Sequence, residues 1–208
     1  ERFNTRDVYA SGASLNGYNE LSGISVNWIA GLEFYSEQTE RMRWATEDRV
    51  RQGQTQDRLF TIQSVSAYAQ GEFAISPYFR PSVGLRYDTY FGSFEANDPG
   101  QAAVDDQIGG LYNVSPKVGV RSTLYEGLDL RASVSNGFSL PNSALKYEAG
   151  LDLGPVQLWQ YEIGATYLPN HWLELDVAGF ILNSSNEIVE NPPGSLEFFN
   201  AGETRRTG

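Results

Sequence analysis

The clearest structural signal in this sequence is the stretch Arg80-Pro81-Ser82-Val83-Gly84-Leu85-Arg86-Tyr87-Asp88-Thr89-Tyr90-Phe91. Its odd-numbered positions are mostly apolar, and its charged residues are all at even-numbered positions. Successive side chains of a β-strand point to opposite faces, so this alternation predicts a strand with one apolar and one charged face.

The same alternation returns in three other stretches, residues 116–124, 128–135 and 173–181. In each of them the charged residues keep to one parity, as Lys117 and Arg121 do in the first. A soluble sheet that buries one face would give the same pattern. Alternation alone therefore leaves open whether the sheet lies in water or in a membrane.

Alternation and turn signals together predict nine strands. They cover Val8–Gly17, Ser25–Thr39, Phe60–Ile75, Tyr78–Phe91, Tyr112–Tyr125, Leu128–Phe138, Gln157–Leu168, Trp172–Leu182 and Leu196–Gly208. Short connections alternate with long ones: the short ones fall at Asn19–Leu21, Ser76-Pro77, Glu126-Gly127 and Pro169-Asn170, and the long ones at 37–58, 92–111, 139–156 and 183–195. An all-β, antiparallel up-and-down sheet with tight turns at one rim and long loops at the other is typical of an outer-membrane β-barrel.

Three further features favour the membrane. The predicted strands are about 10 to 16 residues long, where strands of soluble proteins average about 5 to 6. Aromatic residues gather near both ends of the strands, as expected for rings at two membrane interfaces; they are Tyr18, Tyr78, Phe79, Tyr125, Tyr167 and Trp172 at the short turns, and Phe34, Tyr35, Phe60, Tyr90, Phe91, Tyr112, Phe138 and Trp159 at the long loops. The charged face mixes both signs with Ser, Thr and Gly, which a wet or plugged lumen tolerates and a dry core does not.

Composition excludes several classes. The chain has 208 residues, no Cys, one His and a net charge of −11. The longest unbroken apolar run is Val177 to Leu182, whereas a transmembrane helix needs roughly 20 residues. The acidic balance argues against nucleic acid as a partner. The first residues lack a signal peptide and residues 200–208 read as the start of a strand, so we expect a segment of a longer protein.

Five motifs in order resemble the barrel domain of TonB-dependent outer-membrane receptors, a family with "GlRyD", "sPkvgl", "S.GF..P", "yEiG" and "NaG..r..G" patterns. Here they read as residues 84–88, 115–120, 135–141, 161–164 and 200–208. The resemblance covers about Arg80 to Gly208, and the first 75 residues agree only in strand length and amphipathicity. One departure is Leu153-Gly154-Pro155-Val156-Gln157, where many members have "L.PE", which puts the subfamily and its substrate in question.

The resemblance implies an active transporter of the bacterial outer membrane. Its members bind a scarce solute outside the cell, usually a ferric siderophore, and move it through a 22-stranded barrel closed by an N-terminal plug, with energy from TonB. Residues 1–208 would then be a partial barrel domain, about two-fifths of the wall of such a barrel. The plug is not in this chain, so TonB would be a partner through the missing N-terminal part.

No catalytic residue and no cofactor is predicted, because the chain lacks Cys and its one His, His171, lies in a tight turn. The candidates for substrate binding are Arg41, Arg43 and Trp44, whose two guanidiniums and indole suit an anionic aromatic chelate; Tyr147 and Trp159 are weaker candidates. The alternative is a surface loop in which the two arginines pair with Glu40 and Glu47. Asp98, Asp105 and Asp106 form a solvated acidic loop rather than a Ca²⁺ site, so no metal is predicted.

Three functions stay open at this point. The first is an energy-coupled solute receptor, with outer-membrane lipid and an extracellular metal chelate as partners. The second is a passive porin or structural barrel. The third is a soluble all-β binding module, which would need no detergent. A plug domain before Glu1 would distinguish the first from the second.

Overall fold

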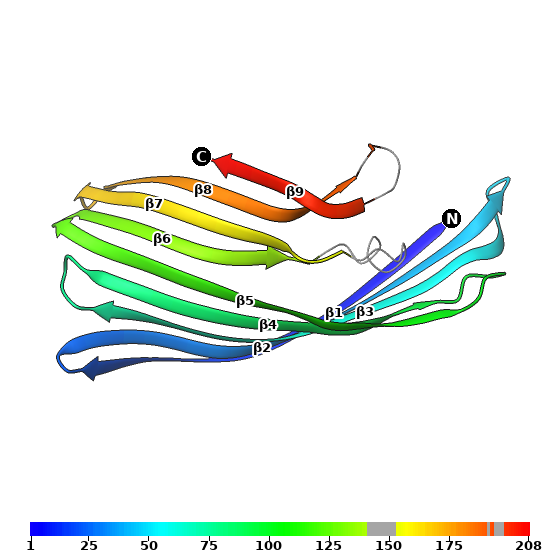
Figure 1. Cartoon of the computed structure of the whole chain (residues 1–208), viewed down its shortest axis with the longest axis horizontal. Helices are drawn as coiled ribbons and strands as arrows, with labels where there is room; N and C mark the ends of the chain where they lie inside the picture. Colours follow the sequence, from blue (N-terminus) through cyan, green and yellow to red (C-terminus); the bar gives the residue numbers. More distant parts are fainter. Residues whose placement is uncertain (141–152, 191, 194–197) are drawn as a thin grey trace. The chain divides into compact units, whose positions relative to one another are not determined.

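The computed structural model describes residues 1–140, 153–190, 192–193 and 198–208, and none of these is helical. Nine strands follow one another in a single sheet in sequence order (Figure 1). They are β1 (Arg2–Leu21), β2 (Ile24–Glu47), β3 (Val50–Ala74), β4 (Arg80–Ala96), β5 (Val104–Tyr125), β6 (Leu128–Ser139), β7 (Val156–Asn170), β8 (Leu173–Glu190) and β9 (Phe198–Thr207). Over the described parts of the chain, no helix is long and apolar enough to cross a membrane.

Tight turns make neighbouring strands antiparallel. Ser22-Gly23 joins β1 to β2 with φ angles of 51° and 80°, and Asp48-Arg49 joins β2 to β3 with φ angles of 46° and 65°. Two consecutive residues with positive φ match the right-handed twist of a hairpin. The register from β5 to β9 is antiparallel throughout, so the predicted up-and-down antiparallel sheet is confirmed.

Several predicted boundaries were wrong. The segment 37–58 is not a long loop: β2 and β3 continue through it to a two-residue turn. The predicted loops 92–111 and 183–195 also shrink, because β4 and β5 leave only residues 97–103 between them and β8 runs to Glu190. The predicted turn at Asn19–Leu21 moves to Ser22-Gly23. Polar side chains misled the prediction, because backbone groups form the ladder and a hairpin in water can be polar on both faces.

The register shows how the two faces of the sheet are built. Val120, Ala132, Ile163 and Gly179 lie opposite one another across β5 to β8. One position away, Arg121 pairs with Arg131, and Arg131 pairs with Gly164. Because paired residues share a face, the apolar and charged faces predicted for these strands are confirmed.

The chain divides into two compact units, each drawing on β1 to β5. Unit 1 consists of Glu1–Ala13, Leu32–Ala67 and Tyr87–Asn113, and unit 2 of Ser14–Gly31, Tyr68–Arg86 and Val114–Gly208. In unit 1 the most buried side chains mix apolar and polar types; among them are Phe60, Phe94, Gln56, Ser66, Asp88 and Asp98. Ser66 donates a hydrogen bond of 2.5 Å to one oxygen of the buried Asp88 carboxylate.

In unit 2, Asn200 of the predicted "NaG" motif holds two other segments. Its side-chain amide accepts from the Gly154 N–H at 2.7 Å and donates to the Gly154 carbonyl at 3.1 Å. It also donates to the carbonyl of Asn186 at 2.7 Å, a residue of β8 with a φ of 58° beside a break in register. Asn200 therefore replaces ladder bonds that the irregular backbone cannot make.

Candidate solute-binding site

Arg41, Arg43 and Trp44 all lie in β2, not in a loop. Because side chains alternate along a strand, Arg41 and Arg43 share one face and Trp44 lies on the other. Trp44 is covered by Arg51, whose Cζ lies 4.1 Å from the ring centroid. The structure thus brings together the two arginines of the predicted site but not the tryptophan.

The same guanidinium of Arg51 also binds a carboxylate. It donates two hydrogen bonds to the carboxylate of Glu1, at 2.6 and 2.9 Å. The backbone N–H of Trp44 donates to the Glu1 carbonyl at 2.9 Å, so β2 is paired with the start of the chain at this point. Trp44 is therefore part of a cluster that fixes the hairpin against β1.

Arg41 lies over a pair of stacked aromatic rings. Its Cζ is 5.1 Å from the centroid of Phe60, and the rings of Phe60 and Phe94 stack with centroids 4.8 Å apart. Both rings are buried, at 2% and 4% exposed. A guanidinium over the face of an aromatic ring is attracted by the ring's quadrupole, so Phe60 positions the charge of Arg41 on this face of unit 1.

Arg58, on the same face of β3 as Phe60, forms an ion pair with Asp98. Its Nη2 lies 2.6 Å and its Nε 3.1 Å from Oδ2, and the aspartate side chain is only 5% exposed. The backbone N–H of Asp57 donates to the other carboxylate oxygen at 2.9 Å. The Arg58 guanidinium lowers the pKa of Asp98 below its ordinary value, and Arg43 contributes through its charge.

Gln56 is a further polar residue on this face of β3. It is 6% exposed, and its Oε1 is buried without a hydrogen-bond donor among the residues that the structure describes. A buried acceptor without a donor costs free energy. The cluster of Arg41, Arg43, Gln56, Arg58, Phe60, Phe94 and Asp98 is called the arginine-phenylalanine cluster below.

Of the two acidic partners that the alternative gave to Arg41 and Arg43, parity excludes Glu40, whereas Glu47 lies on their own face of β2. Glu40 falls on the opposite face of β2 from Arg41 and Arg43, since it differs from them in parity. Glu37, on their own face, accepts a hydrogen bond of 2.6 Å from Arg6 and one from the Tyr35 hydroxyl. Glu37 is thus engaged outside the arginine-phenylalanine cluster, and within the cluster Asp98 forms an ion pair with Arg58.

The two weaker candidates have different outcomes. Tyr147 lies outside the described residues. Trp159 is in β7 of unit 2, where its cross-strand partners are Asn136 and Asn183. By parity it shares a face with Tyr161 and Ile163, which are 43% and 69% exposed. This is the apolar face, so the position favours a role in the aromatic belt over contact with a solute inside the barrel.

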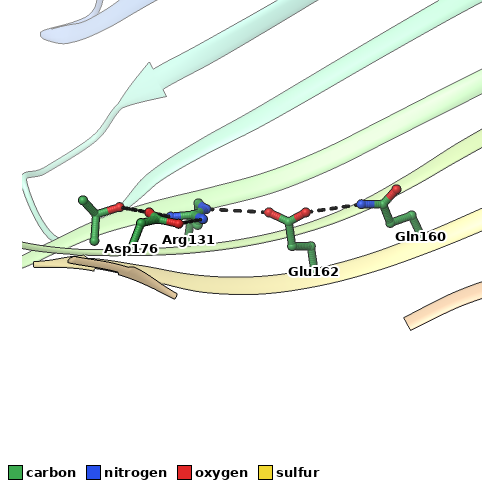
Figure 2. Close-up of polar contacts among 5 residues, drawn as sticks. Arg131, Gln160, Glu162 and Asp176 are labelled. Atoms are coloured by element: carbon green, nitrogen blue, oxygen red, sulfur yellow. Dashed lines mark hydrogen bonds and ion pairs between the residues drawn. The ribbon is translucent and has the colours of Figure 1, made fainter. Parts of the chain in front are cut away.

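The charged face of unit 2 carries a ladder of ion pairs and hydrogen bonds. Figure 2 shows Arg131 between Asp176, at 2.7 and 2.8 Å, and Glu162, at 3.6 Å. Gln160 extends the row by donating to Glu162 at 3.2 Å. Gly164 makes room for this arrangement, because a Cβ there would lie 2.7 Å from the Cζ of Arg131. The charged groups of this ladder are paired with one another, so they offer no strong site for a solute.

The described residues contain no group of three or more His, Cys, Asp or Glu placed to hold a metal ion. Of the three aspartates considered for Ca²⁺, Asp98 is committed to Arg58, whereas Asp105 and Asp106 are exposed residues of β5. His171 lies exposed in the turn between β7 and β8. None of these positions assembles a reactive centre.

Comparison with known proteins agrees with this architecture. The sequence matches the family described as TonB dependent receptor-like, beta-barrel over residues 1–208. The chain therefore belongs to the TonB-dependent receptor family, whose members are outer-membrane β-barrel proteins of transport rather than enzymes. No curated protein matches the sequence.

Solved structures of receptors share the fold at low sequence identity. The ferric-catecholate import receptor Fiu from E. coli K12 aligns with 99% of this chain at 18% identity and a TM-score of 0.77. The ferric citrate transporter FecA aligns with 100% at 16% identity and a TM-score of 0.81. The ferric yersiniabactin uptake receptor FyuA from Yersinia pestis aligns with 100% at 17% identity and a TM-score of 0.70. The chain spans about a third of the length of these structures, 35%, 32% and 32% respectively.

Proposed function

We propose that the protein containing this chain takes up a scarce anionic solute, a ferric siderophore, from outside the cell by TonB-energised transport. Family membership supports the transport class. The observation that carries the choice of solute is the arginine-phenylalanine cluster, in which Arg41 lies over one of two stacked rings and the charges of Arg43 and Arg58 act on Asp98. Guanidinium groups bind carboxylate and catecholate oxygens with directional hydrogen bonds and also stack on flat rings.

Structural relatives support the same choice of solute. These relatives are receptors named for ferric-catecholate import, ferric citrate transport and ferric yersiniabactin uptake, although another relative is named a copper transporter. Ferric chelates of this kind are large, hydrophilic and often anionic. We propose that such a chelate contacts Arg41 and Arg43, and that TonB acts through a plug domain in the part of the protein outside this chain.

Uptake of radioactive iron chelates by cells that carry the intact receptor as their one siderophore receptor tests this function. Arg41→Ala and Arg43→Ala should each weaken binding about tenfold or more, because a charge-assisted hydrogen bond contributes about 1.5–3 kcal/mol. The control is Arg205→Ala, which removes an exposed arginine of unit 2. Arg205 pairs with Asn183 and so lies on the same face as Trp159, away from the proposed site.

Two results would contradict the proposal. Uptake that persists in cells without TonB would indicate a passive porin. Equal uptake by the three variants would show that the arginine-phenylalanine cluster does not contact the solute.

A further inference from the structure

Asp98 fastens the segment between β4 and β5 to β3. The Asn97 N–H donates to the carbonyl of Asp57 at 2.8 Å, and the Asp57 N–H donates back to the Asp98 carboxylate at 2.9 Å. The Gln101 N–H donates to the carbonyl of Asp98 at 3.1 Å, which folds residues 97–103 around this point. The segment is therefore attached to β3 by one backbone hydrogen bond at Asn97 and by the buried side chain of Asp98.

The groups around the Asp98 carboxylate form a site for an anion. Arg58 supplies two guanidinium N–H groups, Asp57 supplies a backbone N–H, and Arg43 adds a second positive charge. Paired N–H donors in this arrangement recognise a carboxylate from any source. A side chain of the protein itself thus fills the place where an anionic solute would be held most firmly.

Gln56 gives this site a second, independent requirement. It lies two residues before Arg58 and so shares its face of β3, and its Oε1 is buried with no donor from the described residues. A hydroxyl or N–H group is needed to satisfy it. A ligand that carries a hydroxyl beside a carboxylate would meet both requirements at once.

We propose that Asp98 is an internal stand-in for a carboxylate of the solute. A hydroxycarboxylate group of the solute exchanges with Asp98 at Arg58 and at the Asp57 N–H, and its hydroxyl donates to Gln56 Oε1. The exchange removes the side-chain attachment of Asp98 and leaves the backbone hydrogen bond of Asn97, so occupancy of the site is converted into movement of the β4–β5 connection beyond Asn97. This inference rests on the proposed function, which it deepens by naming the chemical group that is recognised.

The test uses the intact receptor in detergent, with a nitroxide spin label on Ala102→Cys and any cysteine outside residues 1–208 replaced by serine. Residues 1–208 contain no Cys, and Ala102 is exposed. The probes are malate and succinate, which differ by one hydroxyl. The mobile fraction of the label, measured by electron paramagnetic resonance during titration, reports both binding and release.

Malate should raise the mobile fraction in a saturable way, and succinate should need about a tenfold higher concentration, since it leaves Gln56 unsatisfied. Asp98→Asn should mobilise the label without a probe and bind malate more tightly, because the competing carboxylate is gone. Arg58→Gln should mobilise the label and abolish malate binding. Asp105→Asn, the same change at an exposed carboxylate, should behave as the parent, and heat-modified migration on gels confirms that every variant is folded.

Each contrary result overturns the proposal. An Asp98→Asn variant that is mobile but binds malate no more tightly would show that Asp98 has a structural role alone. Malate that binds without mobilising the label would exclude exchange, and equal affinities for malate and succinate would exclude the role of Gln56. These readouts need no transport, so the proposal can fail while iron uptake through Arg41 and Arg43 stands, and the reverse also holds.

Discussion

Replacing Gly127 by Ala in the turn between β5 and β6 should destabilise the receptor strongly. Gly127 has a φ of 84°, a conformation that costs a residue with a Cβ roughly 1–2 kcal/mol. An added Cβ would also lie 2.4 Å from the carbonyl oxygen of Leu168. That backbone cannot retreat easily, because the Leu168 N–H donates to the Gly127 carbonyl at 2.7 Å.

Breaking this backbone hydrogen bond costs about 1–3 kcal/mol more. Together with the φ term, the expected loss for Gly127→Ala is about 2–5 kcal/mol. Gly23→Ala is the matched control, because Gly23 has nearly the same φ, 80°, and no atom within 4 Å of the added Cβ. It should lose only the roughly 1–2 kcal/mol of the backbone conformation.

Urea titration of the intact receptor refolded in lipid, followed by tryptophan fluorescence, measures the two free energies of unfolding. The midpoint should fall further for Gly127→Ala than for Gly23→Ala at an unchanged slope. Equal losses in the two variants would show that the contact with Leu168 is relaxed at no cost, and the reasoning from the close approach of the two turns would be refuted.

Three further predictions concern other contacts. Gly92→Ala should lower the free energy of unfolding by about 2 kcal/mol or more, because the added Cβ would lie 1.9 Å from a backbone oxygen of β3. Gly53→Ala is the control: the added Cβ meets open space, so the free energy of unfolding should change by less than about 0.5 kcal/mol in the same urea assay. Asn200→Ala should cost about 1–3 kcal/mol and speed amide hydrogen exchange at Gly154, which loses its partner. Arg58 lowers the pKa of Asp98 below the ordinary 3.8. The charged Asp98 carboxylate therefore contributes its full stabilisation above pH 3.8, and this stabilisation is lost as the pH falls through the lowered pKa. The spin label at residue 102 should become mobile only in that acid range, and release near neutral pH would contradict the predicted direction of the pH dependence.

Local pattern was enough to predict the faces of the strands. Alternation in residues 80–91 and in the three similar stretches depends only on the direction of successive side chains, which every strand shares. The motifs around Ser115-Pro116 and Tyr161-Glu162 were likewise readable without coordinates, and the family match confirmed the resemblance. Gly127 could be recognised as a turn residue from the sequence, because tight turns often need a positive φ and glycine adopts it most easily.

The length of the polar hairpins could not be read in this way. Residues 37–58 lack the alternation that burial of one face imposes, so the sequence predicted a loop where β2 and β3 remain paired. The signal that could have been used is Asp48, because aspartate tolerates positive φ and suits a two-residue turn. Counting outward from that turn would have separated Trp44 from Arg41 and Arg43 by parity.

The chain alone therefore determined an amphipathic antiparallel sheet, since side-chain alternation is a local property. Strand length, the positions of the aromatic residues and the family motifs added the outer-membrane type. Only the tertiary structure brought Arg58 to Asp98, 40 residues apart in the chain, and Phe60 onto Phe94. It also placed Trp159 on the apolar face. These outcomes depend on the register between strands, which is decided by where each turn closes and how far backbone pairing continues. A residue such as Asp48 can mark the position of a turn, but no residue type along a polar strand encodes how far the pairing continues.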